Sequence, residues 1–273
     1  MPQMVVMSDV TIQAGGNAHK ILVKNADGPA GLMPFLLHAI SPDELSVVPG
    51  EGVQGRCRLT GKMLLSIGVD KAYMSLISRK GRVGLGSSGG SGSLGLKLPD
   101  QSASSSYTIV CAINIGLGTH DTYTVTRQLI NGYSDSGILS NQMLSATGAG
   151  NPSPTFKNKL LTVGAGINSP FAITEMPDAE QWALVAVDYN DLNGVVSISR
   201  DGINWETAQR AVGGNSIGGT GYVTIGLPTA NTGLTDNLVG DVFVFSDSLR
   251  AHAADDLIAG LMAAMAIDYG IVG

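Results

Sequence analysis

The sequence predicts an all-β protein: a two-sheet antiparallel sandwich with one helix near its C-terminus and an arm at its N-terminus. Short runs rich in Val, Ile, Thr and Tyr recur along the chain, and most of them end at Gly, Pro, Asn or Asp. No long helical segment separates these runs, as it would in a βαβ fold. The 273 residues include 37 glycines, and only 14% are charged, which favours short strands joined by tight turns.

The predicted strands share a length of about four to ten residues and an excess of β-branched side chains. In chain order they cover residues 9–13, 20–24, 107–116, 122–130, 159–167, 182–189, 194–200, 222–226 and 239–246.

One helix is predicted close to the C-terminus, over residues 257–266. Its apolar side chains recur at helical spacing, and Asp255 and Asp256 stand in the first turn, where the helix dipole favours acidic groups. We interpret the apolar stripe as core packing against the sheets. It consists of Leu257, Ile258, Leu261, Met262 and Met265.

The most informative segment runs from Trp182 to Trp205 and reads WALVAVDYNDLNGVVSISRDGINW. Residues 182–189 are apolar at both odd- and even-numbered positions, which predicts an inner strand covered on both faces. In residues 194–200, Val196 and Ile198 alternate with serines, which predicts one face toward the core and one toward water. Asp201-Gly202 is the pair preferred in a type I′ hairpin turn, which would fold Trp205 back as a cover.

The N-terminal part has a different composition, so we predict two units. Residues 1–56 form an arm, or an anchoring and oligomerisation module, too small and too rich in Gly and Pro to build a core alone. Residues 57–273 form the sandwich. Residues 84–106 are rich in Gly and Ser and are either a flexible linker or a long surface excursion.

Two segments resemble a known family. The strand, polar loop, strand and Asp-Gly of residues 182–202 resemble the central hairpin of laminin G-like, concanavalin A-like jelly-roll domains. Gly240 before Val242–Phe245, then Leu249, a helix and Tyr269-Gly270, resemble the closing segment of these domains. The resemblance covers roughly residues 59–271 and implies a jelly-roll sandwich, but the scaffold serves lectins, adhesins, glycanases and virion proteins alike.

The resemblance also implies where catalytic carboxylates would lie, and these are missing. Glycanases on this scaffold carry Glu-x-Asp-x-x-Glu on a strand, and a retaining mechanism needs two carboxyl groups about 5 Å apart. The closest acidic cluster holds Glu175, Asp178 and Glu180, and Pro177 within it indicates a loop. We therefore predict that the protein is not an enzyme and assign no catalytic residue.

Metal and cofactor motifs are weak. The four histidines, His19, His38, His120 and His252, show no paired-ligand spacing, and no nucleophile elbow adjoins them. Residues 84–89 match G-x-G-x-x-G, but more Gly and Ser follow where a helix would have to begin. The resemblance implies a rim calcium site, for which residues 188–194 and 233–237 offer oxygen atoms. Turn hydrogen bonding explains the same residues, so we assign no metal ligand and no cofactor.

A ligand site is predicted in the polar loop after the inner strand. A lectin site needs an aromatic ring beside Asn and Asp side chains. Tyr189, Asn190, Asp191 and Asn193 supply both, although a plain hairpin turn also accounts for them.

The remaining properties concern location and partners. The net charge of −6 gives no attraction to nucleic acid or to an anionic membrane, and the N-terminus lacks a signal-peptide pattern. Cys57 and Cys111 are interpreted as buried free thiols, although a disulfide between them is an alternative. We expect synthesis in a cytoplasm.

Two classes of function follow. The first is a structural virion protein, a bacteriophage capsid decoration or fibre-type protein, with the arm binding capsid or tail proteins and the chain forming a homo-oligomer, with a trimer as the best guess. The second is a carbohydrate-binding, lectin-like module for receptor binding or adhesion, with host glycans as ligands. The sequence leaves the place on the particle, the oligomeric state and the ligand open.

Overall fold

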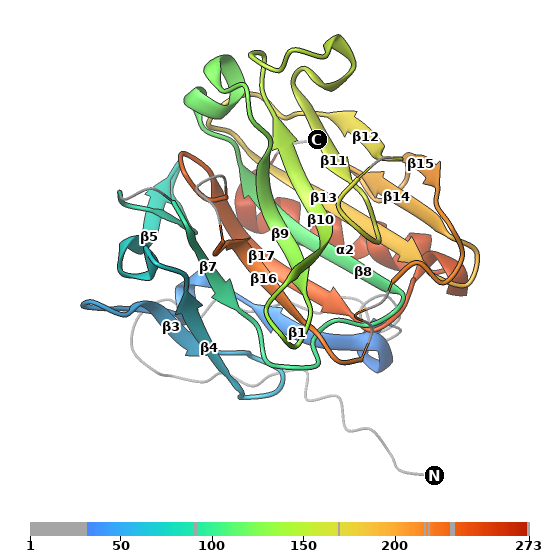
Figure 1. Cartoon of the computed structure of the whole chain (residues 1–273), viewed down its shortest axis with the longest axis horizontal. Helices are drawn as coiled ribbons and strands as arrows, with labels where there is room; N and C mark the ends of the chain where they lie inside the picture. The colour runs from blue at the N-terminus through green and yellow to red at the C-terminus, as the bar shows by residue number, and fades with distance from the viewer. Residues whose placement is uncertain are drawn as a thin grey trace.

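The computed structural model describes residues 32–89, 92–168, 170–215, 217, 219–229 and 233–271. The predicted strands over residues 9–13 and 20–24 lie outside the described residues. Two sheets stack face to face, and every strand pair in the described part is antiparallel. The predicted fold class, a two-sheet antiparallel β-sandwich with a C-terminal helix, is confirmed (Figure 1).

Sheet A has eight strands, seven of which follow one another from edge to edge. The eighth, β1 (Leu36–Ile40), pairs with the second half of β17. The path runs through β15 (Trp205–Gln209), β14 (Val195–Ser199), β13 (Trp182–Asn190), β8 (Tyr107–Asn114), β17 (Leu238–Phe245), β6 (Arg82–Ser87) and β5 (Met74–Arg79).

Sheet B has nine strands and faces the viewer in Figure 1. Its order is β12 (Ala172–Glu175), β11 (Lys159–Thr162), β10 (Leu139–Thr147), β9 (Arg127–Tyr133), β16 (Tyr222–Leu227), β7 (Leu94–Lys97), β4 (Met63–Ile67), β3 (Gly52–Arg56) and β2 (Ser46–Val48).

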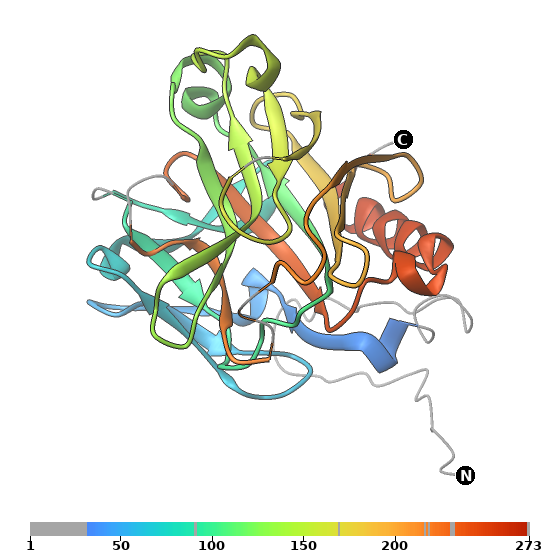
Figure 2. The same ribbon diagram turned by 45° about the vertical axis from the view of Figure 1, so that its right-hand side comes forward.

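Strand β13 is buried on both faces because each face of sheet A has a cover. Toward sheet B, Val185 and Val187 of β13 join the core between the sheets. On the opposite face, Trp182 and Leu184 pack beneath α2 (Asp255–Tyr269), which lies behind sheet A in Figure 1 and at its side in Figure 2. The prediction of an inner strand covered on both faces is thus confirmed.

The helix α2 is longer than the predicted 257–266, and it packs as predicted. Ile258, Leu261, Met262, Met265 and Tyr269 are buried against sheet A. Gly270 ends the helix in the left-handed region, at φ 63°, where glycine carries no Cβ penalty. No helix in the described part of the chain is long and apolar enough to cross a membrane.

The glycine- and serine-rich segment 84–106 belongs to the sandwich. Its first residues lie in β6 of sheet A, and β7 then pairs with β16 and β4 in sheet B. Leu94, Leu96 and Leu98 are fully buried in the core between the sheets. The segment is a strand-bearing crossover between the two sheets, so neither of the two predicted alternatives, linker or surface excursion, describes it.

The structure places the second half of the predicted arm in the sandwich. Strand β1 pairs with β17 in sheet A, while β2 and β3 extend the edge of sheet B. The predicted boundary between residues 56 and 57 therefore falls between β3 and β4, which pair with each other. Residues 1–31 lie outside the described residues, and an anchoring role for them stays a prediction.

The Asp201-Gly202 turn differs from the predicted type I′ hairpin, which requires positive φ at both residues. Gly202 has φ 74°, whereas Asp201 is not among the residues with positive φ. Ser199 pairs with Trp205, so residues 200–204 form a five-residue loop. The Asp201 carboxylate holds this loop by accepting hydrogen bonds from the N–H groups of Ile203 (2.8 Å) and Asn204 (2.7 Å).

Candidate functional site

The polar loop predicted to bind a ligand joins β13 to β14 at one end of the sandwich. Tyr189 does not face solvent there. Its ring is fully buried against Tyr107, with the ring centroids 5.9 Å apart, and its hydroxyl donates to Asp191 Oδ1 at 2.7 Å. Burial, followed by the contact with Asp191, raises the pKa of Tyr189 above its usual value. As placed here, Tyr189 is a core residue and offers no open aromatic surface.

The other three predicted residues lie together on the loop. Asn190 Oδ1 accepts the N–H of Leu192 at 3.0 Å, and Asn193 Oδ1 accepts the N–H of Val195 at 2.9 Å. Asp191 Oδ1 accepts the N–H of Asn215 at 3.1 Å, which ties this loop to the β15–β16 connection. These bonds are what a hairpin turn needs. Ligand binding by Asn190, Asp191 and Asn193 stays a prediction.

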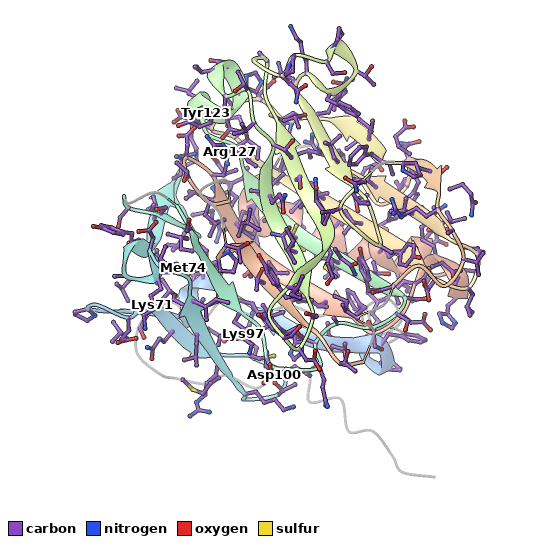
Figure 3. All side chains as sticks on the ribbon, viewed as in Figure 1. Lys71, Met74, Lys97, Asp100, Tyr123 and Arg127 are labelled. Atoms are coloured by element: carbon purple, nitrogen blue, oxygen red, sulfur yellow. The ribbon has the colours of Figure 1, made fainter. Side chains whose placement is uncertain are left out.

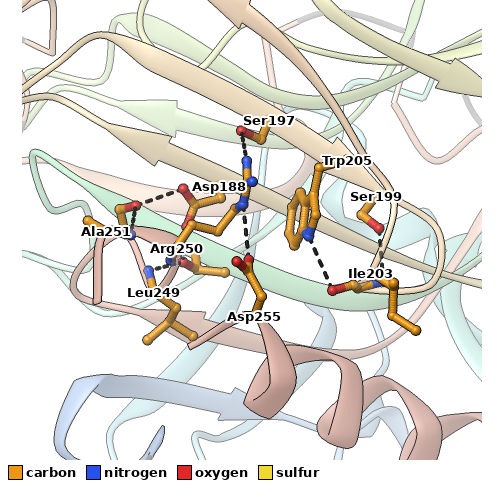
Figure 4. Close-up of polar contacts among 12 residues, drawn as sticks. Asp188, Ser197, Ser199, Ile203, Trp205, Leu249, Arg250, Ala251 and Asp255 are labelled. Carbon is orange, nitrogen blue, oxygen red and sulfur yellow. Dashed lines mark hydrogen bonds and ion pairs between the residues drawn. The ribbon is translucent and has the colours of Figure 1, made fainter. Parts of the chain in front are cut away.

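A buried carboxylate anchors the segment between β17 and α2 on the outer face of sheet A (Figure 4). Asp188 accepts hydrogen bonds from Thr108 Oγ1 at 2.6 Å and from Ser248 Oγ at 2.7 Å. Burial raises its pKa to about 6, although the hydrogen bonds from Thr108 and Ser248 oppose the rise. This cluster fastens the loop before α2 to the sheet.

Arg250 extends the same cluster to β14. Its Nη1 donates to Ser197 Oγ at 2.7 Å, its Nε lies 3.0 Å from Asp255 Oδ1, and its guanidinium stacks 4.6 Å from the Trp205 ring centroid (Figure 4). Ser197 and Ser199 are consequently buried, so the predicted water-facing side of β14 is wrong. The polar face of β14 lies beneath polar side chains of the last segment of the chain. A period-two pattern does not distinguish such a polar environment from solvent.

The outer face of sheet B, the face turned away from sheet A, has a different character. In the figures no helix lies over it, in contrast to sheet A (Figures 1 and 2). Its central strands present a row of cross-strand neighbours, each paired with the next in register. From β10 to β3 the row holds Gln142, Asn131, Thr224, Lys97, Leu65 and Gln54.

A glycine in β16 shapes the middle of this face. Gly226 has φ 93°, and a Cβ there would lie 2.7 Å from the carbonyl oxygen of Leu94. In this conformation the Gly226 carbonyl accepts two side-chain hydrogen bonds, from Asn131 Nδ2 at 3.0 Å and from Thr224 Oγ1 at 2.9 Å. A carbonyl oxygen accepts hydrogen bonds, so the Asn131 atom bonded to the Gly226 carbonyl must be the donor Nδ2. The Oδ1 atom of Asn131 is left as an acceptor.

Several polar atoms on this face are buried without a hydrogen-bond partner in the structure. They are Asn131 Oδ1, Gln128 Oε1 and Ser145 Oγ. Gln128 and Ser145 lie opposite each other on β9 and β10, and a register shift beside them brings Asn131 to the same face. Buried polar atoms in native proteins are nearly always satisfied, so these atoms indicate bound water or a bound ligand.

An aromatic and charged group borders these atoms. The rings of Tyr133 and Tyr222 stack, with centroids 5.6 Å apart and planes 9° apart. Lys97 Nζ lies 4.2 Å from the Tyr222 ring centroid and 2.7 Å from Asp100 Oδ1. Figure 3 places Lys97 and Asp100 together near one end of this face. Both tyrosines are buried, so they support the face while Lys97 and Asp100 reach solvent.

This face was not predicted from the sequence. Bulges in β9 and β10 shift the alternation of side chains, so period-two reading does not place Gln128, Ser145 and Asn131 on one side. The one available signal was the polar composition of residues 139–147, LSNQMLSAT.

The acidic residues considered for catalysis do not form a pair on one strand. Glu175 ends β12 and forms an ion pair with Lys159, while Asp178 and Glu180 follow in a turn. The predicted loop before Trp182 is therefore confirmed. Among the residues that the structure describes, no three His, Cys, Asp or Glu side chains come together as a metal site.

Comparison with known proteins gives a fold and no family. No protein-family model and no curated protein matches the sequence. Solved structures do match. One is the sialidase of Trypanosoma rangeli, with a TM-score of 0.57, 14% identity, and coverage of 86% of this chain and 33% of the sialidase. The chain thus spans about a third of the length of that enzyme.

A second match is domain 4 of AbnA, an extracellular GH43 arabinanase from Geobacillus stearothermophilus, solved in complex with arabinotriose. The TM-score is 0.54 and the identity 12%, with 84% of this chain and 98% of that domain covered. At these identities the likeness concerns the fold. It places this chain among the β-sandwich folds.

Proposed function

We propose that this protein is a carbohydrate-binding β-sandwich module without catalytic activity, and that the outer face of sheet B carries its ligand. The observation that supports this most directly is the set of unpartnered polar atoms of Gln128, Asn131 and Ser145 on a sheet face that no helix of the described part covers (Figure 1). Because these atoms are themselves buried, they would reach a ligand through bound water. Of the two functions considered from the sequence, glycan binding is the one that agrees with this face.

The chemistry of these atoms favours a neutral sugar. Asn131 Oδ1 and Gln128 Oε1 are acceptors, so their partner must donate. Sugar hydroxyl groups donate, and the net charge of −6 disfavours a sugar that carries a carboxylate. The exposed carbon atoms of Met63 and Leu65, on β4 beyond β16 and β7 of the same face, add an apolar surface for the C–H face of a sugar ring.

The structural likenesses support the same class of ligand. The arabinanase domain, matched over nearly its whole length, was solved with arabinotriose bound. The sialidase match covers a third of that enzyme, so its activity is not carried over to this chain. Arabinotriose is therefore a suitable first probe for this protein.

The proposal is tested by calorimetric titration of the full chain with arabinotriose and a panel of neutral oligosaccharides. For a ligand that binds, we expect Gln128→Ala to weaken binding at least about fivefold, since one hydrogen bond is worth roughly 1 kcal/mol. Lys97→Ala should weaken it as well. Asn193→Ala, in the predicted rim loop, serves as the matched control and should bind like the unmodified protein.

The outcomes separate the two candidate sites. If Asn193→Ala or Asn190→Ala loses binding while Gln128→Ala retains it, the ligand occupies the rim loop and the outer face of sheet B is not the site. If no neutral glycan binds at millimolar concentration, the proposed function is wrong.

The absence of catalysis is tested with the same panel. We expect no hydrolysis product from any oligosaccharide after prolonged incubation, as measured by chromatography. Turnover that disappears on replacing Glu175, Asp178 or Glu180 would reverse the proposal and make this an enzyme.

The place on a virus particle rests on the sequence alone. The order of neighbouring genes tests it, since capsid or tail genes on either side would support a virion protein. Glycan binding and a place on a particle are compatible, because a decoration or fibre protein is able to display a glycan-binding domain.

A further inference from the structure

The two cysteines of the chain differ in their polar contacts. Both are buried and free. Cys111 lies in the middle of β8, among apolar side chains of the core between the sheets. Cys57 lies directly after β3, at the start of the short connection to β4, and residues 59–63 beyond it are exposed. Both thiols belong to the core between the sheets, but Cys57 lies beside an exposed loop and Cys111 does not.

Hydrogen-bond donors converge on the Cys57 sulfur. His38 Nδ1, on the neighbouring strand β1, lies 3.4 Å from Cys57 Sγ. The hydroxyl and N–H of Thr60, within the exposed loop, and the N–H of Ala39, on β1, also bond to this sulfur. With the proton of His38 on Nδ1, these contacts favour the anionic form of the sulfur.

The pKa values of the two thiols differ accordingly. Burial would raise the pKa of Cys57, but the hydrogen bonds from His38, Thr60 and Ala39 outweigh it, and the pKa falls to about 6. Burial without such donors raises the pKa of Cys111 to about 12. At neutral pH the first thiol is mostly ionised and the second is not.

The charged groups around the exposed loop are paired. Arg58 Nε lies 2.9 Å from Glu44 Oε1, and Arg56 Nη1 donates to the Gly61 carbonyl at 2.7 Å. Asp241 lies close enough to Arg58 for an electrostatic interaction, as does Asp43 to Asp241. His38 is the titratable group in direct contact with the sulfur, so the thiolate is expected to depend on it first.

We propose that Cys57, with His38, is a nucleophilic thiol site that reacts with small hydroperoxides and forms a sulfenic acid. The thiolate attacks the terminal oxygen of the hydroperoxide, an S–O bond forms and the O–O bond breaks. The sulfur is oxidised and the peroxide reduced. The departing alkoxide or hydroxide takes the proton held by His38 and leaves as alcohol or water. This activity is independent of glycan binding.

The site is distinct from the usual two-cysteine redox pair. The only other thiol of this chain, Cys111, is enclosed in the core and protonated at neutral pH. The sulfenic acid therefore has no ionised partner thiol in the chain, and it persists until an external thiol reduces it.

The first test treats the full chain with hydrogen peroxide, traps sulfenic acid with dimedone and locates the adduct by mass spectrometry. We expect the adduct on Cys57 and none on Cys111, which serves as the internal control. A Cys111→Ser variant should behave like the unmodified protein, and Cys57→Ser should give no adduct.

The second test follows the rate of Cys57 alkylation by iodoacetamide against pH. We expect the rate to level off above an inflection near pH 6 and the inflection to move up by more than one unit in His38→Asn. The pH profile is the decisive measurement, because a low-pKa thiolate is also a weaker nucleophile and the rate alone changes little. A merely structural role for His38 would leave the inflection in place.

If His38→Asn does not fold, the inflection is measured in the unmodified protein. Its thiolate absorbance near 240 nm is followed against pH, and the absorbance of Cys57→Ser is subtracted. An inflection above pH 8 in the unmodified protein overturns the proposal. So does a native protein in which Cys57 stays unmodified at every pH while denatured protein reacts.

Discussion

Trp182 joins three separate parts of the molecule. Its Nε1 donates to the Arg79 carbonyl at 2.7 Å, and its ring lies 5.0 Å from the ring of Tyr269 on α2. Gly84 leaves room for it, since a Cβ at that position would lie 2.8 Å from the indole. A single side chain of β13 therefore contacts the β5–β6 hairpin and the helix at once.

Removing the Trp182 ring should lower the free energy of unfolding by more than an average mutation does. We expect Trp182→Ala to lower the free energy of unfolding by about 3–5 kcal/mol, as large truncations of buried aromatics do. Chemical denaturation measures the loss. Trp205→Ala is the matched control and should cost less, because Trp205 is only partly buried. Equal losses for both would show that Trp182 is not the anchor described above.

Asp188 makes stability depend on pH. Burial raises its pKa from 3.8 to about 6, so the folded protein holds the proton more tightly than the unfolded chain does. Folding is therefore favoured at low pH, and this contribution is lost as the pH rises from about 4 to about 6. Two pKa units correspond to about 3 kcal/mol as an order of magnitude.

The variant Asp188→Asn isolates this effect. We expect the unmodified protein to lose stability relative to Asp188→Asn between pH 4 and pH 6.5, measured by urea denaturation at several pH values. Other carboxyl groups titrate in the same range, and they cancel in the difference between the two proteins. Parallel curves would mean that Asp188 is not protonated in the fold.

The contact between β17 and α2 depends on a glycine. A Cβ on Gly240 would lie 2.2 Å from the Tyr269 hydroxyl, which accepts the N–H of Asp241 at 2.8 Å. These residues, Gly240 and Tyr269, both belong to the closing segment singled out in the sequence, and the structure brings them into contact. Their spacing in the sequence thus reflects a packing requirement.

Two glycine substitutions test this contact. Gly240→Ala should destabilise the protein by about 1–3 kcal/mol, since it displaces a buried tyrosine in a packed core. Gly260→Ala lies within α2 with no atom near its Cβ position, and it should stabilise by about 0.5–1 kcal/mol. Thermal unfolding should shift in opposite directions for the two variants. A loss of stability from both would contradict this account of Gly240.

Elements with a regular apolar pattern could be predicted from the sequence, whereas elements with an interrupted pattern could not. Strand β13 is apolar at both parities because sheet A is covered twice, and α2 shows its stripe because one face packs on that sheet. Strand β10 escaped prediction because bulges break its alternation and its outward residues are polar. Residues 122–126, predicted as the start of a strand, lie before β9 because a π-helical turn at Gly118–Thr122 ends close to it.

The two candidate sites also differ in how far the sequence could predict them. The sequence located the rim loop of Asn190, Asp191 and Asn193 because these residues are neighbours in the chain. It placed Tyr189 there too, although parity assigns that ring to the core. The outer face of sheet B combines β9, β10, β16 and β7, and no local pattern reports which strands lie side by side.

At the scale of the molecule, the boundary predicted after residue 56 can be tested by truncation. A chain of residues 32–273 retains every described strand, and we expect it to fold. A chain of residues 57–273 lacks β1, β2 and β3, which belong to both sheets, and we expect it to aggregate. Circular dichroism and size-exclusion chromatography distinguish the results. A folded, monomeric 57–273 would support the predicted boundary.

The pairing of β1 with β17 has a consequence for synthesis. These strands are neighbours in sheet A, although about two hundred residues separate them along the chain. Helical neighbours close in sequence are able to fold while the ribosome is still working, but this pair forms only after β17 and all the residues between the two strands have emerged. The edges of β8 and β6 that β17 later covers are exposed during that interval. We therefore expect the nascent chain to need chaperones, and fast translation to lower the yield of native protein.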